Sequence, residues 1–312
     1  MGRFSSKNIR TLQRRIMSWY RKHQRQLQWR TTTDPYEILL SEVMLQQTQV
    51  ARVQEKLPIF LKRFPTLKRL ASSTKADVIQ AWEGMGYNNR AIRLREMAKG
   101  IMLKHDGEIP RDPQALQQLP GIGPYSAHAA ACFAYRKQVP VVDTNIRRVL
   151  SRLLWRMKAI SDLRSDKDIW KTAGEILPAD AYTWNQALMD LGAVLCTARK
   201  PLCNLCPVEK SCASRHLGHI NLSRARQRAM RKPEPSYRGM PQRIWRGKII
   251  QVLRTLNGKG STTLRELGVA VKDNFRKDET GWILSVIGRL KADGLVQTQT
   301  TSKTIRIMLA RE

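Results

Sequence analysis

Helix-start signals recur through the first 215 residues of the chain. Asp34, Thr74 and Asp112 each stand at a capping position before apolar residues at helical spacing. Proline follows both aspartates, and Asp77 completes a capping box with Thr74. No alternating run of apolar and polar residues, which would predict a strand, interrupts these segments. The pattern therefore predicts a mainly α-helical fold for this part of the chain.

The composition changes after residue 215. Residues 216–242 are basic, contain prolines and have few periodic apolar residues, so we expect a basic linker near phosphates. Residues 243–312 then contain three helical segments followed by two alternating segments around Thr301-Ser302-Lys303. This order predicts a small winged-helix-like α/β domain at the C-terminus. Such domains bind DNA or dock proteins, and the sequence leaves both roles open.

The charge of the chain indicates a polyanionic partner. The 312 residues suggest about two domains, and 56 Lys and Arg against 25 Asp and Glu give a formal net charge of +31. DNA, RNA and an anionic membrane surface fit this sign, but no apolar run approaches the roughly 18 residues of a membrane span. The basic N-terminus lacks the apolar segment of a signal peptide. We expect a monomeric, cytoplasmic, nucleoid-associated protein that binds nucleic acid; a basic surface that only maintains solubility is the alternative.

Four of the five cysteines lie in the segment CTARKPLCNLCPVEKSC, at a spacing of C-x6-C-x2-C-x5-C. They are Cys196, Cys203, Cys206 and Cys212. In a cytosolic chain such a group more often binds metal than forms disulfides. The spacing suits either zinc or an iron–sulfur cluster. The fifth, Cys132, lies in an apolar helical run and is expected in a core.

A second motif, LPGIGPYSAHAA at residues 119–130, places two glycines before an alanine-rich helix. Gly121 and Gly123 would allow a tight turn whose amides, with those of the helix start, face one anion. The wider pattern is that of a helix-hairpin-helix, which binds the DNA backbone without reading sequence.

Two carboxylates have unusual sequence surroundings. Glu42, in ILLSEVMLQQTQ, shares a helical stripe with Ile38 and Leu45, where burial of an unpaired carboxylate is costly. Asp143, in VPVVDTNIRRVL, stands at a helix start after an apolar entry segment. A helix cap worth about 1 kcal/mol explains Asp143 equally well, and capping is compatible with chemistry.

Five features together resemble the helix-hairpin-helix DNA glycosylases, the endonuclease III superfamily, and most closely its MutY-like adenine glycosylases. They are SEVMLQQTQV, LPGIGPYSA, VVDTNIRRV, TWNQALMDLGAVLC and the cysteine spacing, in the family's order over residues 10–215. The resemblance implies a six-helix barrel at residues 34–140, packed against a domain of residues 1–33 and 141–215. It also implies a 4Fe-4S cluster, rather than zinc, on the four cysteines.

The resemblance implies hydrolysis of the N-glycosidic bond of adenine mispaired with guanine or 8-oxoguanine in double-stranded DNA. Glu42, with a pKa raised by its apolar stripe, would protonate adenine N7. Asp143, ionised at the helix start, would stabilise the oxocarbenium-like sugar and position water. Tyr125 stands where members with strand-cutting lyase activity have a lysine, so we expect a monofunctional glycosylase.

Further residues receive roles from the same resemblance. Gln47 and Tyr87 would wedge into the duplex around the opposite base, and Gln186 would contact the flipped adenine. Pocket walls are expected from three residues: Trp29, Arg30 and Tyr125. A packed aromatic explains Trp29 equally well. Asn145 is expected near the DNA, although the family usually has Gly-Asn where this chain has Thr144-Asn145.

The chain departs from the family at two other places. Asn88 stands where a second tyrosine is frequent, and residues 243–312 do not resemble the MutT-like domain of full-length MutY proteins. Two other functions therefore remain open: a mismatch-specific thymine or uracil glycosylase acting opposite guanine, and a non-catalytic DNA-binding iron–sulfur protein. The presence of both Glu42 and Asp143 favours an enzyme, because binding alone needs neither carboxylate.

Overall fold

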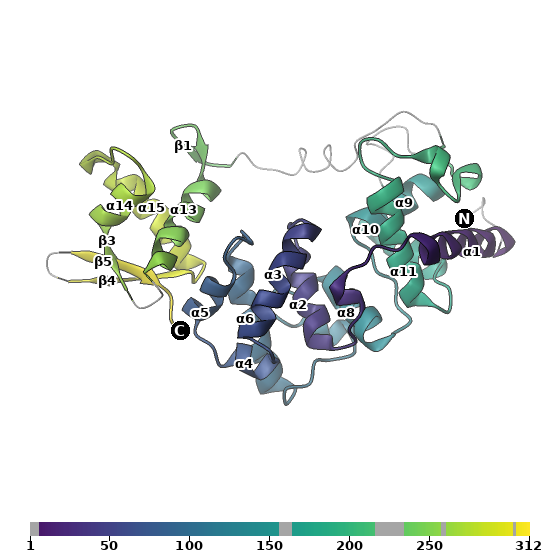
Figure 1. Cartoon of the computed structure of the whole chain (residues 1–312), viewed down its shortest axis with the longest axis horizontal. Coiled ribbons are helices and arrows are strands. Elements are labelled where there is room, and N and C mark those ends of the chain that lie inside the picture. The colour runs from purple at the N-terminus through teal and green to yellow at the C-terminus, as the bar shows by residue number, and fades with distance from the viewer. Residues whose placement is uncertain (1–5, 156–163, 216–233, 257–259, 302–303) are drawn as a thin grey trace. The chain divides into compact units, whose positions relative to one another are not determined.

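The computed structural model describes residues 6–155, 164–215, 234–256, 260–301 and 304–312 (Figure 1). Contacts group the chain into two compact units. The first unit comprises residues 1–38, 111–117 and 122–231, and the second comprises residues 39–110, 118–121 and 232–312. Most described elements are helices, as the sequence predicts for the first 215 residues.

The three expected helix starts are confirmed. Asp34 Oδ1 accepts a 2.8 Å hydrogen bond from the Tyr36 amide at the start of α2 (Pro35–Leu45). Thr74 and Asp77 form a reciprocal capping box at α5 (Lys75–Ala81). Asp112 Oδ2 accepts from the amide of Ala115 at 3.0 Å in α7 (Pro113–Gln117). These local bonds satisfy amides that the helices themselves leave unpaired.

The first unit is entirely helical where it is described. Its core joins the N-terminal helix to the later helices through buried residues such as Ile16, Val149 and Trp184. Cys132 is fully buried in this core, as expected. Its further elements are α1 (Ser6–His23), η1 (Gln28–Arg30), α8 (Pro124–Tyr135), α9 (Thr144–Leu154), α10 (Asp166–Glu175), α11 (Ala181–Asp190), the π-helical η3 (Leu191–Leu195), η4 (Cys203–Leu205) and η5 (Glu209–Ser211).

The second unit contains α5 and the helices α3 (Val50–Arg63), α4 (Leu67–Ala71) and α6 (Asn89–Lys104). Buried aromatic rings fix the packing of α3 against the end of α5. The rings of Phe60 and Trp82 meet edge to face with centroids 5.8 Å apart, and Phe60 also contacts Phe64. The two compact units divide the chain by contacts, at positions other than residues 33, 140 and 215. The domain boundaries expected at those three residues stay a prediction.

The C-terminal part of the second unit has winged-helix topology, which confirms the expected α/β domain. Three antiparallel strands pair in the order β3-β5-β4, with Thr262 opposite Ile307 and Val296 opposite Leu309. The elements are α13 (Gln242–Thr255), β3 (Thr262–Thr263), α14 (Leu264–Val271), η6 (Lys277–Glu279), α15 (Thr280–Ala292), β4 (Val296–Thr300) and β5 (Ile305–Leu309).

The predicted linker is only partly covered by the structure. Residues 216–233 of it lie outside the described residues. Its last part is not a linker but a short hairpin of β1 (Ser236–Tyr237) and β2 (Met240–Pro241). Arg238 and Gly239 form the turn with φ of 48° and 75°, the left-handed pair that a two-residue hairpin favours. Among the described helices, none combines the length and apolarity that crossing a membrane requires.

Candidate active site and cysteine segment

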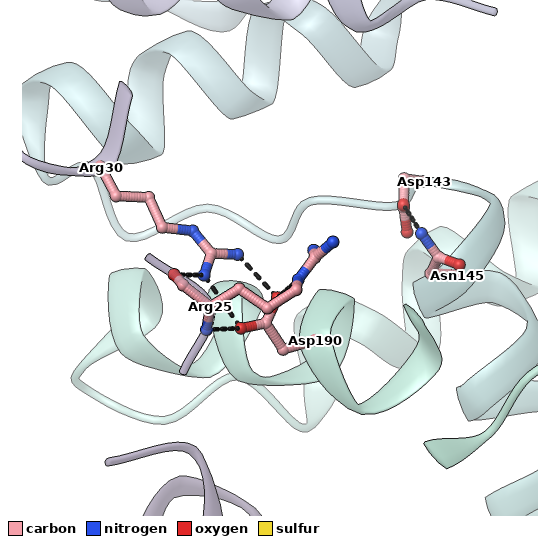
Figure 2. Close-up of polar contacts among 5 residues, drawn as sticks. All are labelled: Arg25, Arg30, Asp143, Asn145 and Asp190. Atoms are coloured by element: carbon pink, nitrogen blue, oxygen red, sulfur yellow. Dashed lines mark hydrogen bonds and ion pairs between the residues drawn. The ribbon is translucent and has the colours of Figure 1, made fainter. Parts of the chain in front are cut away.

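Asp143 caps the start of α9 in the first unit. Its Oδ1 accepts from the amide of Ile146 at 2.6 Å. Its Oδ2 accepts from Asn145 Nδ2 at 2.8 Å (Figure 2). The apolar entry segment is buried at Val141 and Val142, as expected. Burial raises the pKa of Asp143, and the hydrogen bonds from Ile146 and Asn145 offset this only in part. Asp143 is therefore a stronger base than an ordinary aspartate, although the bonds at the helix start favour its ionised form as expected. Its ionised state in the reaction stays a prediction.

A chain of hydrogen bonds joins Asp143 to the segment that carries the first cysteine. Asn145 Oδ1 accepts from Arg148 Nη2 at 2.8 Å, and Arg148 also donates to the carbonyl oxygens of Gly192 at 2.6 Å and Cys196 at 2.7 Å. A Cβ at Gly192 would lie 2.7 Å from Asn145 Cβ, so only glycine permits this approach. The sequence displays Arg148 but gave no indication of this bridging role.

Glu42 lies on α2 and is 4% exposed. Ile38 on the same stripe is also buried, whereas Leu45 is half-buried. The predicted placement of a carboxylate on an apolar helical face is therefore confirmed. Glu42 belongs to the second unit and Asp143 to the first.

Gln47 and Tyr87 occupy exposed turns of the second unit, and both have left-handed backbone conformations. Gln47 follows α2 with φ of 57°, and Tyr87 precedes α6 with φ of 45°. The Tyr87 side chain is 50% exposed. Such a conformation costs about 1–3 kcal/mol at a residue other than glycine and persists only where the surroundings fix it.

Arg90 connects these two turns, and the sequence gave no signal for it. Its Nη1 donates to the carbonyl oxygens of Val43 and Met44 at 3.0 and 2.8 Å. Its Nη2 donates to Met85 O at 3.0 Å and to Thr48 Oγ1 at 2.9 Å. The guanidinium thus ties the end of α2 to the loop before α6. Burial lowers the pKa of Arg90 to about 10.

The two glycines of the hairpin motif differ in their requirements. Gly121 has φ of 81°, and a Cβ there would lie 3.0 Å from Arg93 Cβ, so glycine is needed. Gly123 caps α8 with φ of −93° and ψ of 178°, a conformation open to any residue. A Cβ at Gly123 would meet nothing within 4 Å. The tight turn therefore depends on Gly121, and the surface at Gly123 is open. Tyr125, in the first turn of α8, is half-buried against the core of the first unit.

Arg30 is engaged in a buried ion pair with Asp190 (Figure 2). Its Nη1 and Nη2 donate to the two Asp190 oxygens at 2.9 and 2.8 Å. Arg25 adds bonds from its backbone amide at 3.0 Å and from Nε at 2.7 Å. Burial would raise the pKa of the fully buried Asp190, but the bonds from Arg30 and Arg25 lower it below its usual range.

The other expected pocket residues are buried in the first unit. Trp29 is 8% exposed in η1, and Gln186 is 4% exposed on α11, the helix that ends at Asp190. Sequence reasoning missed Asp190, although it stands in the apolar run ALMDLGAVL just as Glu42 stands in its own. A lone carboxylate within an apolar helix was the signal that could have revealed it.

Cys196 follows η3, and the other three cysteines lie in or directly after η4 and η5. All four are half-buried. Burial raises the pKa of Cys206 to about 12 and that of Cys212 to about 11, and the charges of Cys196 and Cys203 raise both further. Arg152 Nη1 lies 3.5 Å from Cys196 Sγ, and Cys212 Sγ donates to the Arg152 carbonyl at 3.3 Å. The thiols are therefore close enough to influence one another's ionisation.

The four cysteine thiols are candidate ligands for zinc or for an iron–sulfur cluster. Within the described ranges, no three His, Cys, Asp or Glu side chains are grouped tightly enough to hold one metal ion. A single zinc draws four thiolates to about 2.3 Å from one centre, whereas a four-iron cluster places each thiolate on a different iron. The four half-buried cysteines supply the four thiolates that either group needs.

Comparisons with known proteins agree with this arrangement. The family model of HhH-GPD superfamily base excision DNA repair proteins matches residues 40–175. An adenine DNA glycosylase of Mycobacterium tuberculosis is 39% identical over 288 residues, which cover 90% of this chain and 88% of that protein. Because the unmatched tenth is shorter than the C-terminal domain, the similarity reaches into that domain.

Two further matches are thymine-DNA glycosylases. One, from Aeropyrum pernix, is 38% identical over 212 residues, covering 65% of this chain and 94% of that protein. The other is the solved structure of a thermostable thymine-DNA glycosylase, with a TM-score of 0.63, 29% identity and coverage of 67% of this chain and 96% of that one. Neither match covers more than about two thirds of the chain, unlike the mycobacterial one. The chain belongs to the HhH-GPD superfamily of base excision DNA repair proteins, and within it to the adenine DNA glycosylases.

Proposed function

We propose that the protein is a monofunctional DNA glycosylase that removes adenine mispaired with guanine or 8-oxoguanine from double-stranded DNA. The observation that carries this proposal is the match to an adenine DNA glycosylase over 90% of the chain, which reaches into the C-terminal domain. The formal net charge of +31 suits a polyanionic duplex substrate. An enzyme with this substrate works where the chromosome is, so we place it in the cytoplasm with the nucleoid.

Two carboxylates carry the chemistry in this proposal. Cleavage of the N-glycosidic bond leaves negative charge on the departing base and positive charge on the sugar. Glu42, buried on α2, donates a proton to N7 of adenine and so makes the base a better leaving group. Asp143 stabilises the oxocarbenium-like sugar and accepts a proton from the attacking water. The raised pKa of Asp143 supports its role as the base, because a more basic carboxylate takes that proton more readily.

Residues on exposed turns contact the DNA duplex in this proposal. Gln47 and Tyr87 wedge around the base opposite adenine, and the bonds of Arg90 to both turns support a shared function. The open surface at Gly123 allows a phosphate to approach the amides at the start of α8. Tyr125 has no amine with which to form a Schiff base, so the product is an abasic site in an uncut strand.

The residues proposed for the pocket that binds the flipped base are less exposed than the wedge residues Gln47 and Tyr87. Gln186 contacts the flipped adenine, and Asn145 acts beside Asp143, to which it is hydrogen-bonded. Trp29 and Tyr125 line the pocket. Arg30 stabilises the wall of the pocket, because its guanidinium is already hydrogen-bonded to Asp190.

We also propose that Cys196, Cys203, Cys206 and Cys212 hold a 4Fe-4S cluster. When bound, the cluster would cross-link residues 196–212 and order the basic segment that contains Arg199, Lys200 and Lys210. The hydrogen bonds of Arg148 to Gly192 and Cys196 then couple that ordered segment to Asn145 beside Asp143. The chemistry of base removal stays with the two carboxylates.

A second candidate is removal of thymine or uracil opposite guanine. The 38% identity to the thymine-DNA glycosylase of Aeropyrum pernix favours it. The two functions separate in one experiment, in which duplexes containing A:G, A:8-oxoguanine, T:G, U:G and A:T pairs are incubated with excess enzyme and then cleaved with alkali. We expect strand breaks only at adenine opposite guanine or 8-oxoguanine. Breaks at thymine or uracil would establish the second candidate, and no breaks at all would refute both.

A further inference from the structure

The loop between α5 and α6, residues 82–88, carries Tyr87 and has an unusual backbone. Gly84, Gly86 and Tyr87 have φ of 78°, 66° and 45°. A run of left-handed residues has little helical or sheet hydrogen bonding of its own. Its conformation therefore depends on contacts from neighbouring elements.

Arg254 of the C-terminal domain supplies contacts at both ends of this loop. Its Nε and Nη2 donate to the Ile79 carbonyl oxygen at 3.1 and 2.9 Å, and Nη2 also donates to Asn88 Oδ1 at 2.9 Å. Ile79 lies in the last turn of α5, whose carbonyls have no partner within the helix. Basic side chains commonly cap such carbonyls, but α5 has none in its last turn. Arg254 provides this cap from a distant part of the sequence.

Asn88 is available for this contact because it does not cap its own helix. It occupies the N-cap position of α6, where an asparagine side chain usually accepts from the first-turn amides, yet it makes no side-chain cap hydrogen bond. Its Oδ1 accepts from Arg254 instead. One guanidinium thus spans the end of α5 and the start of α6.

Other contacts make this a packed interface within the second unit. Ala76, Ile79 and Ile92 share a buried cluster with α13 residues that include Trp245 and Leu253. Gln251 Nε2 donates to Glu83 Oε1 at 2.6 Å, and the Lys75 amide donates to the Arg311 carbonyl oxygen at 3.3 Å. The C-terminal domain and the helices that flank the Tyr87 loop therefore form one hydrophobic core.

We infer that Arg254 is a positioning residue for the Tyr87 loop, so that the C-terminal domain fixes the wedge before DNA binds. The inference rests on the proposed role of Tyr87 as the wedge residue. It gives the domain a part in mispair recognition without any catalytic group or direct contact with a base. The preference for mispaired over fully paired duplex then depends on a contact between Arg254 and Asn88.

The first test needs no DNA. Arg254→Gln removes the forked donor, Asn88→Ala removes its acceptor in the loop, and Arg265→Gln, at an exposed position on α14, is the matched control. Hydrogen–deuterium exchange of residues 82–91 should become about tenfold faster in the first two variants, as expected when a hydrogen bond to a charged group is lost. It should not change in Arg265→Gln. Unchanged exchange in both Arg254→Gln and Asn88→Ala would overturn the inference.

The second test measures discrimination. In Arg254→Gln, the ratio of affinities for an A:G duplex and an A:T duplex should fall about tenfold, and adding Asn88→Ala should reduce it no further. Arg254→Lys keeps the charge but not the fork, so it should behave like Arg254→Gln. Full discrimination by Arg254→Lys would identify a simple charge contact and overturn the inference. A wild-type protein that releases no base would refute the proposed function, and the exchange test would still decide the role of Arg254.

Discussion

Replacing Asp143 by asparagine should separate its structural role from its chemical one. Asparagine caps helices as well as aspartate does, and its Oδ1 can keep the 2.6 Å bond from the Ile146 amide. Its amide nitrogen would, however, face Asn145 Nδ2, whose own oxygen is held by Arg148. One hydrogen bond is therefore lost, which costs about 0.5–1.5 kcal/mol. The loss is partly offset because a charge is no longer buried. The free energy of unfolding should fall by no more than about 1 kcal/mol.

The rate of base removal should respond far more strongly. Without a carboxylate to stabilise the sugar and accept a proton, Asp143→Asn should excise adenine at least roughly 100-fold more slowly than wild type under single-turnover conditions. Asp143→Ala is the matched variant, because it removes the cap as well and should lose about 1 kcal/mol of stability. Near-normal excision by Asp143→Asn together with slow excision by Asp143→Ala would show that the residue acts only as a cap.

The dependence of this rate on pH provides a second measurement. Burial raises the pKa of Asp143, so the carboxylate gains a proton at a higher pH than an ordinary aspartate does. Excision by the wild type should therefore decrease as the pH falls through that raised pKa. The residual activity of Asp143→Asn should lack this acidic limb. An identical limb in both proteins would assign the titration to another group.

Three further results are expected. Glu42→Gln should reduce excision at least roughly 100-fold with DNA affinity nearly intact, and normal single-turnover excision would remove Glu42 from the mechanism. Asp190→Asn should lower the free energy of unfolding by about 3–5 kcal/mol in urea titrations, because it leaves Arg30 buried without its partner; the same change at the exposed Asp166 should cost at most about 1 kcal/mol, and equal effects at both sites would contradict the assignment. The purified protein should be yellow-brown with four irons per chain if the cysteines hold a cluster as proposed, whereas one zinc and no iron after anaerobic preparation would exclude it.

Several features of the fold could be predicted because their causes are local. Asp34, Thr74 and Asp112 start helices through bonds to amides two or three residues away. The winged-helix order follows from apolar periodicities of 3.6 and 2, which are also read over short windows. The burial of Glu42 followed from its position on an apolar stripe for the same reason. All the residues that produce each of these signals lie within a short stretch of the sequence.

The predictions that failed or were missing depend on distant partners. The composition predicts a linker where the structure has the short hairpin of β1 and β2, because two-residue strands have no periodicity to detect. The raised pKa of Asp143 could not be predicted, since the sequence gives its helix start but not its degree of burial. Arg90 was missed because its acceptors near Val43 lie 47 residues away.

By itself, the sequence determined which segments are helices or strands, which residues cap them, and which motifs place the chain among the glycosylases. Only the tertiary structure decided the partners of the buried charges. Arg30 pairs with Asp190 across 160 residues, and Arg254 reaches Asn88 across 166. A buried guanidinium must find acceptors to offset its lost hydration, but any arginine among the many in this basic chain could have met that need. The packing of the helices selects which one does, because it alone brings a given donor and acceptor within hydrogen-bonding distance.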